Sequence, residues 1–165
     1  MRRDTMQRRF EAVRTNSALQ NLWIRRAIAF AIDSLVLLVV FAAFNAVLAV
    51  ALLFPLFVLN VNALSGFFSG FSAAFGIVVV WGYYVAFEGS TGATIGKRFM
   101  DLKVRPLQGA MSHTKAFVRS FSKAWLPVFV FLFALDLIVG FLTPGDPRQR
   151  FSDAFANTAV FHTAV

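Results

Sequence analysis

Charged and apolar residues are distributed very unevenly along this chain. No charged side chain occurs between Ser34 and Phe87, a run of 54 residues dense in Phe, Val, Leu and Ala. A helix that crosses a lipid bilayer needs about 20 mostly apolar residues, so this run is long enough for two crossings and the turn between them. The pattern predicts an integral membrane protein, with a first span from Arg26 to about Val50 and a second span from Phe71 to Phe87.

The segment between the two predicted spans is rich in residues that weaken helices. They are Pro55, Asn60, Asn62, Ser65, Gly66, Ser69 and Gly70. Their clustering predicts that the chain reverses direction there, on the far side of the membrane.

Basic segments flank the apolar run. The first 26 residues contain seven Arg against two acids, and the segment from Lys97 to Lys123 contains seven basic residues against only Asp101. Because cytoplasmic loops of membrane proteins carry an excess of Lys and Arg, we expect both segments in the cytoplasm, against the inner membrane. The chain then divides into a basic N-terminal segment (1–22), a membrane domain (23–160) and a short tail (161–165).

Composition narrows the classes of function. The chain is 58% hydrophobic and has no Cys, so disulfides, thiolate metal sites and thiol nucleophiles are excluded. His113 and His162 are too isolated to suggest a metal site, and no nucleophile signature accompanies them. We therefore expect no enzyme, no cofactor and no metal. The net charge of +8 lies in blocks beside apolar spans, which favours a bilayer with anionic headgroups over nucleic acid as the partner.

The stretch after the second span predicts three different local structures. Gly92 to Lys97 lacks the spacing of a nucleotide phosphate loop, so we interpret it as a tight turn with a basic residue near lipid phosphate. DLKVR, residues 101–105, alternates polar and apolar residues and predicts a short strand or extended piece. From His113 to Trp125 the period becomes helical.

This helical segment is amphipathic. Lys115, Arg119 and Lys123 recur every four residues on one face, and Phe117, Phe121 and Trp125 recur on the other. Such a helix is typical of the membrane interface, with the three basic residues contacting lipid headgroups. The alternative is a helix packed on its own domain.

A third apolar segment runs from Leu126 to Leu142 and contains Pro127 and Asp136. It is only just long enough to span a bilayer, so it either crosses or re-enters, and the side of the C-terminus stays open. The predicted fold class is an all-α integral membrane protein: a helical hairpin of two spans, an interfacial amphipathic helix and a third embedded segment.

Four stretches, taken in order, carry a family resemblance. They are RAIAFAID (Arg26 to Asp33), TGATIGKRFMDLKV (Thr91 to Val104), MSHTKAFVRS (Met111 to Ser120) and RQRFSDAFANTAV (Arg148 to Val160). Together they resemble the successive blocks of the RDD family of small multispanning membrane proteins, which is named for one Arg and two Asp. The resemblance implies that Arg26, Asp33 and Asp153 are this triad. Ser152 stands where the family usually has His, and Asn157 where it usually has Gly.

The resemblance also implies a candidate activity, because cation/proton exchange has been proposed for some family members. Asp33 and Asp136 lie inside apolar segments, where an unpaired acid costs about 2.5–3.5 kcal/mol, so they form the candidate ion or proton site. Alternatively, Asp33 anchors another segment through hydrogen bonds or a basic residue. The absence of His at position 152 weakens a proton relay.

Two functional hypotheses follow. One is a small cation or proton transporter that acts as a homo-oligomer, in which both acids line one polar cavity. The other is a non-transporting accessory or scaffold subunit of a larger membrane assembly, in which the acids are paired within the chain. Under either hypothesis we expect Arg26 and Asp153 to approach each other at the cytoplasmic surface.

Overall fold

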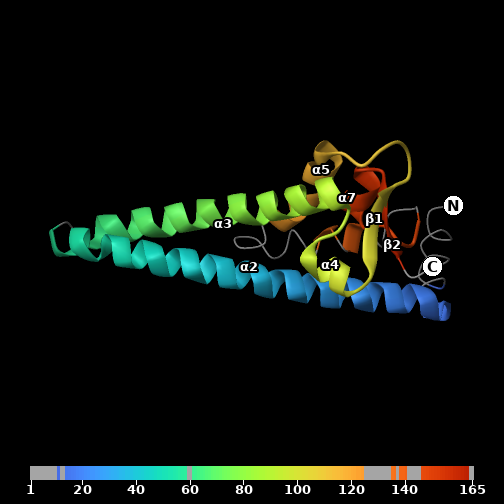
Figure 1. Cartoon of the computed structure of the whole chain (residues 1–165), viewed down its shortest axis with the longest axis horizontal. Coiled ribbons are helices and arrows are strands. Elements are labelled where there is room, and N and C mark those ends of the chain that lie inside the picture. The colour runs from blue at the N-terminus through green and yellow to red at the C-terminus, as the bar shows by residue number, and fades with distance from the viewer. Residues whose placement is uncertain are drawn as a thin grey trace.

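A long helical hairpin dominates the computed structural model, which describes residues 11, 14–58, 61–124, 135–136, 138–140 and 146–163. Helix α2 covers Ser17–Val58 and helix α3 covers Val61–Thr91. In Figure 1 they run side by side, with the turn at one end of the molecule and a small folded head at the other. Within them, Ser17–Ala51 and Ser65–Thr91 are long and apolar enough to cross a membrane. By length and composition, the structure therefore has two candidate membrane-spanning helices, which include the two predicted segments.

The helices extend further than the sequence pattern suggested. Both continue through the weak helix formers that were expected to form a broad reversal, including Pro55 in α2 and Gly66 and Gly70 in α3. The Ser69 hydroxyl donates to the Gly66 carbonyl, a bond made within the helix. In an apolar environment a helix satisfies every backbone polar group internally, and this outweighs the weak helix propensity of these residues.

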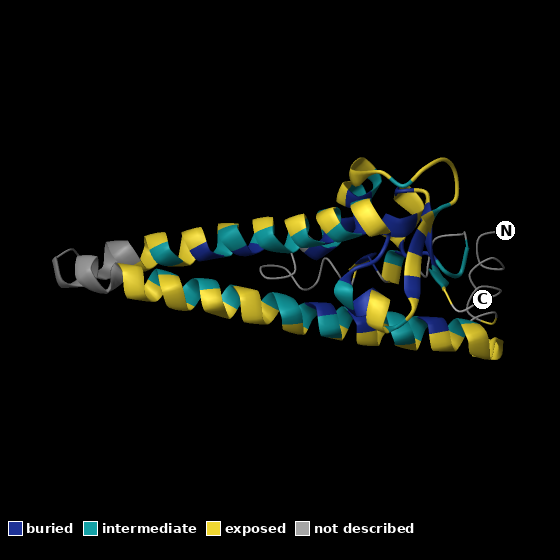
Figure 2. Ribbon diagram, in the orientation of Figure 1, coloured by how far each residue is buried: buried dark blue, intermediate teal, exposed yellow. Residues whose placement is uncertain are grey.

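The outer surface of the hairpin is apolar. Figure 2 shows exposed and half-buried residues along most of both helices, and buried residues gathered at the head. Leu35, Val47 and Val78 are each more than 60% exposed. An uninterrupted exposed apolar surface of this kind suits lipid rather than water.

The head packs where α2 begins and α3 ends (Figure 1). We use "head" for residues 92–124 and 146–163. They form helix α4 (Ile95–Phe99), strand β1 (Leu102–Pro106), helix α5 (His113–Ala124), helix α7 (Phe151–Phe155) and strand β2 (Thr158–His162). Helix α4 contacts α2, and α5 contacts both α3 and α7.

The two strands correct the all-α prediction. Strand β1 lies where the sequence predicted an extended piece, and it pairs antiparallel with β2, which was not foreseen. Val104 lies opposite Val160 in this ribbon, and both are buried with Leu102 and with Leu22 and Ala29 of α2. The prediction failed because β2 acquires its strand character from a partner more than 50 residues away, which local periodicity does not register.

Asn157 explains one departure from the family pattern. It connects α7 to β2 in the left-handed region, with φ of 53°. Glycine adopts this conformation without strain, and Asn is among the residues that tolerate it best. Asn157 can therefore replace the usual Gly without changing the path of the chain.

The prediction of a third embedded segment falls mainly outside the described residues. Of Leu126 to Leu142, only residues 135–136 and 138–140 are described, and they are helical. Whether the segment crosses or re-enters stays a prediction. Residues 146–163, in contrast, pack in the head beside the start of α2 (Figure 1).

Candidate functional site

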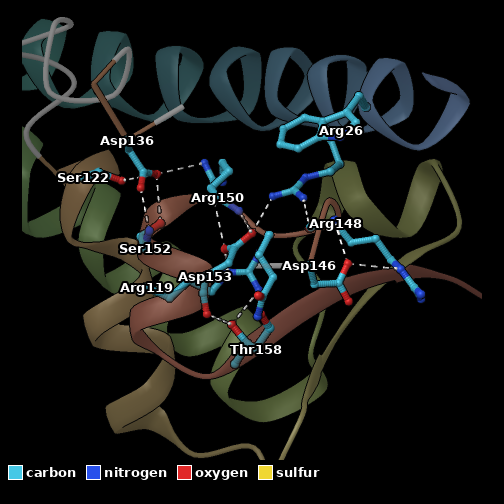
Figure 3. A network of polar contacts seen from close by, with 12 residues as sticks. Arg26, Arg119, Ser122, Asp136, Asp146, Arg148, Arg150, Ser152, Asp153 and Thr158 are labelled. Carbon is cyan, nitrogen blue, oxygen red and sulfur yellow. Dashed lines mark hydrogen bonds and ion pairs between the residues drawn. The ribbon is translucent and has the colours of Figure 1, made fainter. Parts of the chain in front are cut away.

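A buried network of ion pairs lies between the hairpin and the head, and Figure 3 shows the part of it around Asp136 and Asp153. Its cations are Arg26, Lys97, Arg119, Lys123 and Arg150, and its carboxylates are Glu88, Asp136 and Asp153. No side chain of the eight is more than 9% exposed. Buried charges at this density need partners within the chain, because each one loses its hydration.

Glu88 forms one centre of the network, near the end of α3. Lys97 donates a hydrogen bond to Oε1 of Glu88, and the Lys123 ammonium lies 3.0 Å from the same oxygen. Burial lowers the pKa of Lys97 well below its usual value and lowers the pKa of Lys123 to about 8. The negative charge of Glu88 opposes both shifts. The carboxylate therefore holds two crowded, desolvated ammonium groups.

Arg119 joins this centre to a second one at Asp153. Its Nε atom lies 3.0 Å from Oε2 of Glu88 and 3.2 Å from Oδ1 of Asp153, and its side chain is fully buried. Its Nη1 atom donates to the Thr158 hydroxyl at 3.4 Å, which ties the network to strand β2.

Asp153 connects α7 to the beginning of α2. Arg26 Nη2 donates to Asp153 Oδ2 at 2.6 Å, and Arg26 Nη1 donates to the Arg148 carbonyl at 2.6 Å. The expected contact between Arg26 and Asp153 is thus present. Burial disfavours the charge on Asp153, but Arg119, Arg150 and Arg26 outweigh it and hold the pKa of Asp153 well below its usual value.

Asp136 lies at the edge of this network. Its carboxylate accepts hydrogen bonds from the Ser122 hydroxyl and from both the backbone N–H and the hydroxyl of Ser152, at 2.7–3.0 Å. Arg150 lies 3.6 Å from Asp136 and also 3.6 Å from Asp153, so it links the two acids (Figure 3). Ser152, which replaces the usual His of the family pattern, therefore serves as a hydrogen-bond donor to an acid.

Asp33 is held by a separate set of donors. It accepts hydrogen bonds from the hydroxyls of Tyr83 and Thr94 and from the backbone N–H of Gly96, all at 2.6–2.7 Å. These bonds fasten α4 onto α2. Asp33 and Asp136 line different cavities, so the structure does not bring the two members of the candidate ion site together.

Gly96 makes this attachment possible. A Cβ atom on Gly96 would lie 2.1 Å from the Ala29 carbonyl oxygen of α2. Only a residue without a side chain allows the two helices to approach closely enough for the Gly96 N–H to reach Asp33.

The prediction that Lys115, Arg119 and Lys123 face the headgroups at the membrane surface is wrong for two of the three. Helix α5 is present, but Arg119 and Lys123 point into the protein and pair with Glu88. Lys115 is half-buried and donates to the Gln108 carbonyl. The opposite face of α5 exposes Phe117 and Phe121, which pack against Trp81. The basic face turns inward because buried carboxylates attract it more strongly than screened headgroups do.

The prediction that the turn at Gly92 to Lys97 places a basic residue near lipid phosphate is wrong for the same reason. Lys97 is 7% exposed and pairs with Glu88, so it does not lie at the surface of the protein.

A cavity of about 300 Å³ adjoins the network. It is lined by Trp23, Arg26, Ala27, Phe30, Asp33, Tyr84, Lys97, Arg119, Lys123 and Arg150. The lining combines apolar side chains of α2 with the cations of the network. Among the described residues, no group of three or more His, Asp or Glu side chains could hold a metal ion.

Sequence analysis missed three members of the network: Glu88, Lys97 and Arg150. Glu88 carried a signal, since it is the first charge after the long uncharged run and precedes a strongly basic segment. Arg150 carried none, because a basic residue in a polar tail is normally exposed.

Comparison with known proteins gives one match. The model described as the RDD family matches residues 21–157, which is most of the chain. No curated protein and no solved structure matches.

Proposed function

The chain belongs to the RDD family, and we propose that it is a non-transporting accessory or scaffold subunit of a larger membrane assembly, without enzymatic activity. One observation carries the proposal: every acid of the candidate site is occupied by partners within the chain. Asp33 accepts three hydrogen bonds, and Asp136 accepts three and pairs with Arg150. A transported ion would have to displace these partners.

In this proposal the ion network is a structural joint. Arg26 of α2, Glu88 of α3 and Asp153 of the tail belong to three segments far apart in the sequence, and the network ties all three. Removing one member of a buried ion pair costs about 3–5 kcal/mol, because the remaining charge stays buried without compensation. The joint therefore fixes the head on the hairpin, where the head can present a defined surface to another subunit.

The proposed location is the inner membrane, with the N-terminus and the head in the cytoplasm and two spans. The structure puts Ser17 and Ser112 near the head and Ser65 near the turn of the hairpin (Figure 1). All three are exposed. Single Cys variants at 17 and 112 should react with an impermeant thiol reagent from the cytoplasmic face, and a Cys at 65 from the opposite face. Labelling of 17 and 112 from different faces would contradict the arrangement.

Cation or proton transport by an oligomer is the second candidate, and a specific observation favours it. Asp33 lines a cavity that also contains Lys97 and Lys123, and the pKa of Lys123 is about 8. An acid and a lysine that titrates near neutral pH are suitable elements of a proton-linked carrier.

Ion flux into liposomes separates the two candidates. The purified chain is reconstituted with an entrapped pH indicator, and Na⁺ or K⁺ gradients are imposed. The scaffold proposal expects no flux above protein-free vesicles. Flux that is lost in Asp33→Asn and retained in Asp146→Asn, a change in an exposed ion pair with Arg148, would instead establish transport.

A further inference from the structure

We propose that the cavity between α2 and the head binds a phosphate group, supplied either by a free phosphate or by the headgroup of an anionic phospholipid. This goes beyond the scaffold role, which requires no ligand. The proposal rests on the charge of the cavity, on unpaired donors in its wall and on the division of that wall into cationic and apolar parts.

The charges around the cavity do not balance. Five cations line it: Arg26, Lys97, Arg119, Lys123 and Arg150. The carboxylates available to them in the described part of the chain are Glu88, Asp136 and Asp153, and Asp33 in the cavity wall is a fourth. When both lysines are protonated, five cations against four carboxylates leave an excess of one positive charge in a buried site. A bound anion would compensate this charge, whereas a cation would increase it.

Two buried donors in the wall lack an acceptor. The Tyr84 hydroxyl and Nη2 of Arg119 make no hydrogen bond in the structure, although Tyr84 is 2% exposed and Arg119 is fully buried. Both residues line the cavity. A buried donor without a partner is unfavourable, because it has given up its hydrogen bonds to water. A ligand rich in acceptor oxygens, such as phosphate, satisfies both donors at once.

The Lys123 ammonium completes this polar corner of the wall. It lies 3.8 Å from the centre of the Tyr84 ring and 3.0 Å from Glu88. An ammonium, a guanidinium and a phenol hydroxyl therefore border one cavity. Arg offers paired N–H groups whose spacing matches two oxygens of a phosphate, and Lys supplies a point charge.

The other wall is suited to an amphiphile. Trp23, Ala27 and Phe30 of α2 present apolar surface to the cavity, within the helix that is long enough to cross a membrane. A volume of about 300 Å³ lies at the lower end of the range for small-molecule sites. It is large enough for a phosphate group and the adjoining part of a lipid headgroup.

Direct binding measurements test the proposal on the full-length chain in a neutral detergent. The probes are inorganic phosphate and a short-chain anionic phospholipid, with chloride at equal ionic strength and a short-chain zwitterionic phospholipid as controls. Binding is read by isothermal titration calorimetry, and the rise in unfolding temperature with ligand gives a second readout. We expect saturable binding of at least one phosphate-bearing anion and none of chloride.

The two probes distinguish the source of the phosphate. Binding of inorganic phosphate alone supports a soluble anion, binding of the anionic phospholipid alone supports a headgroup that also uses the apolar wall, and binding of both supports a site that accepts either. Absence of binding by both, or equal binding of the zwitterionic lipid, overturns the proposal.

Variants assign the binding to this cavity. Tyr84→Phe removes one hydroxyl and no charge, and should weaken binding about three- to tenfold, the effect of one hydrogen bond. Lys123→Gln should weaken it at least tenfold, and Lys103→Gln, which removes an exposed cation on β1, should leave it unchanged. Because Tyr84→Phe keeps every ion pair, it remains informative if Lys123→Gln fails to fold. Unchanged affinity in Tyr84→Phe, or an equal loss in Lys103→Gln, would refute the assignment.

Discussion

Arg26 Nη2 lies 2.6 Å from Oδ2 of Asp153, although 127 positions separate the two residues in the chain. The contact joins the beginning of the first membrane helix to α7, and the same carboxylate is approached by Arg119 of α5 and by Arg150, three positions before Asp153. The carboxylate of Asp153 is fully buried. Three guanidinium groups therefore share this carboxylate, and Arg119 and Arg150 also pair with Glu88 and Asp136.

Replacing Asp153 by Asn should destabilise the protein by about 3–5 kcal/mol, since the change removes the carboxylate that pairs with buried Arg26 and is shared by Arg119 and Arg150. The loss can be measured as a fall in the unfolding temperature in detergent, followed by Trp fluorescence. Asp146→Asn is the matched control, because its pair with Arg148 is partly exposed and 3.4 Å long. Such a pair contributes about 0–1 kcal/mol. Equal effects of the two changes would show that the Asp153 network does not stabilise the fold.

Gly96→Ala should prevent α4 from docking on α2. The added methyl group would lie 2.1 Å from the Ala29 carbonyl oxygen and 3.0 Å from the Asp33 carboxylate carbon. Because the first of these neighbours is backbone, the helices must separate and the bonds to Asp33 break. We expect a loss of several kcal/mol. It would appear as greater protease sensitivity of residues 92–100 than in Gly82→Ala, where a Cβ atom meets nothing within 4 Å.

The hairpin could be predicted from the sequence because its cause is local. The absence of charge from Ser34 to Phe87 fixes the environment of both helices, and this environment alone requires helical backbone. The amphipathic helix at 113–124 was located by the same kind of periodicity. Its orientation was predicted wrongly. The basic face of this helix turns inward toward the buried carboxylate of Glu88, and periodicity does not show where Glu88 lies.

The network itself was only partly predictable. The family pattern pointed to Arg26 and Asp153, and the structure brings them together. Glu88 joins the network through Lys97, Arg119 and Lys123, Arg150 joins it through Asp136 and Asp153, and strand β2 exists only through its pairing with β1. Most of these contacts join different elements of the fold, whereas the periodicity of one sequence reports mainly local structure.

Stability should rise with pH through the titration of Lys123. Burial lowers the pKa of Lys123 to about 8, against 10.5 in the unfolded chain. Between these values the unfolded state binds more protons, so unfolding becomes less favourable as the pH increases. The gain is on the order of 3 kcal/mol, at about 1.4 kcal/mol for each pKa unit.

The charged and titratable groups around Lys123 are Tyr84, Glu88, Lys97, Arg119 and Arg150. The pKa of Lys97 is also lowered by burial, so it contributes to the same rise. The prediction therefore compares two proteins. Between pH 7.5 and 10.5, the unfolding temperature should rise more steeply with pH in the wild type than in Lys123→Met. Parallel curves would mean that Lys123 does not titrate in this range.

The attachment of α4 through Asp33 can be measured with a double-mutant cycle. Asp33→Asn replaces a carboxylate that accepts three hydrogen bonds by an amide with one acceptor oxygen, and each bond to a charged group contributes about 1.5–3 kcal/mol. Thr94→Val removes one of the three donors with little change of shape, together with the cap that Thr94 provides to α4. Because the bond between Asp33 and Thr94 is lost in either single variant, the double variant should be less destabilised than the sum, by about 0.5–3 kcal/mol.

Ser90→Ala serves as the control partner, since the Ser90 hydroxyl bonds to the Ala86 carbonyl instead, and its effect should add to that of Asp33→Asn. A cycle with Thr94→Val that is equally additive would show that the short contact between Asp33 and Thr94 does not hold α4 against the first helix.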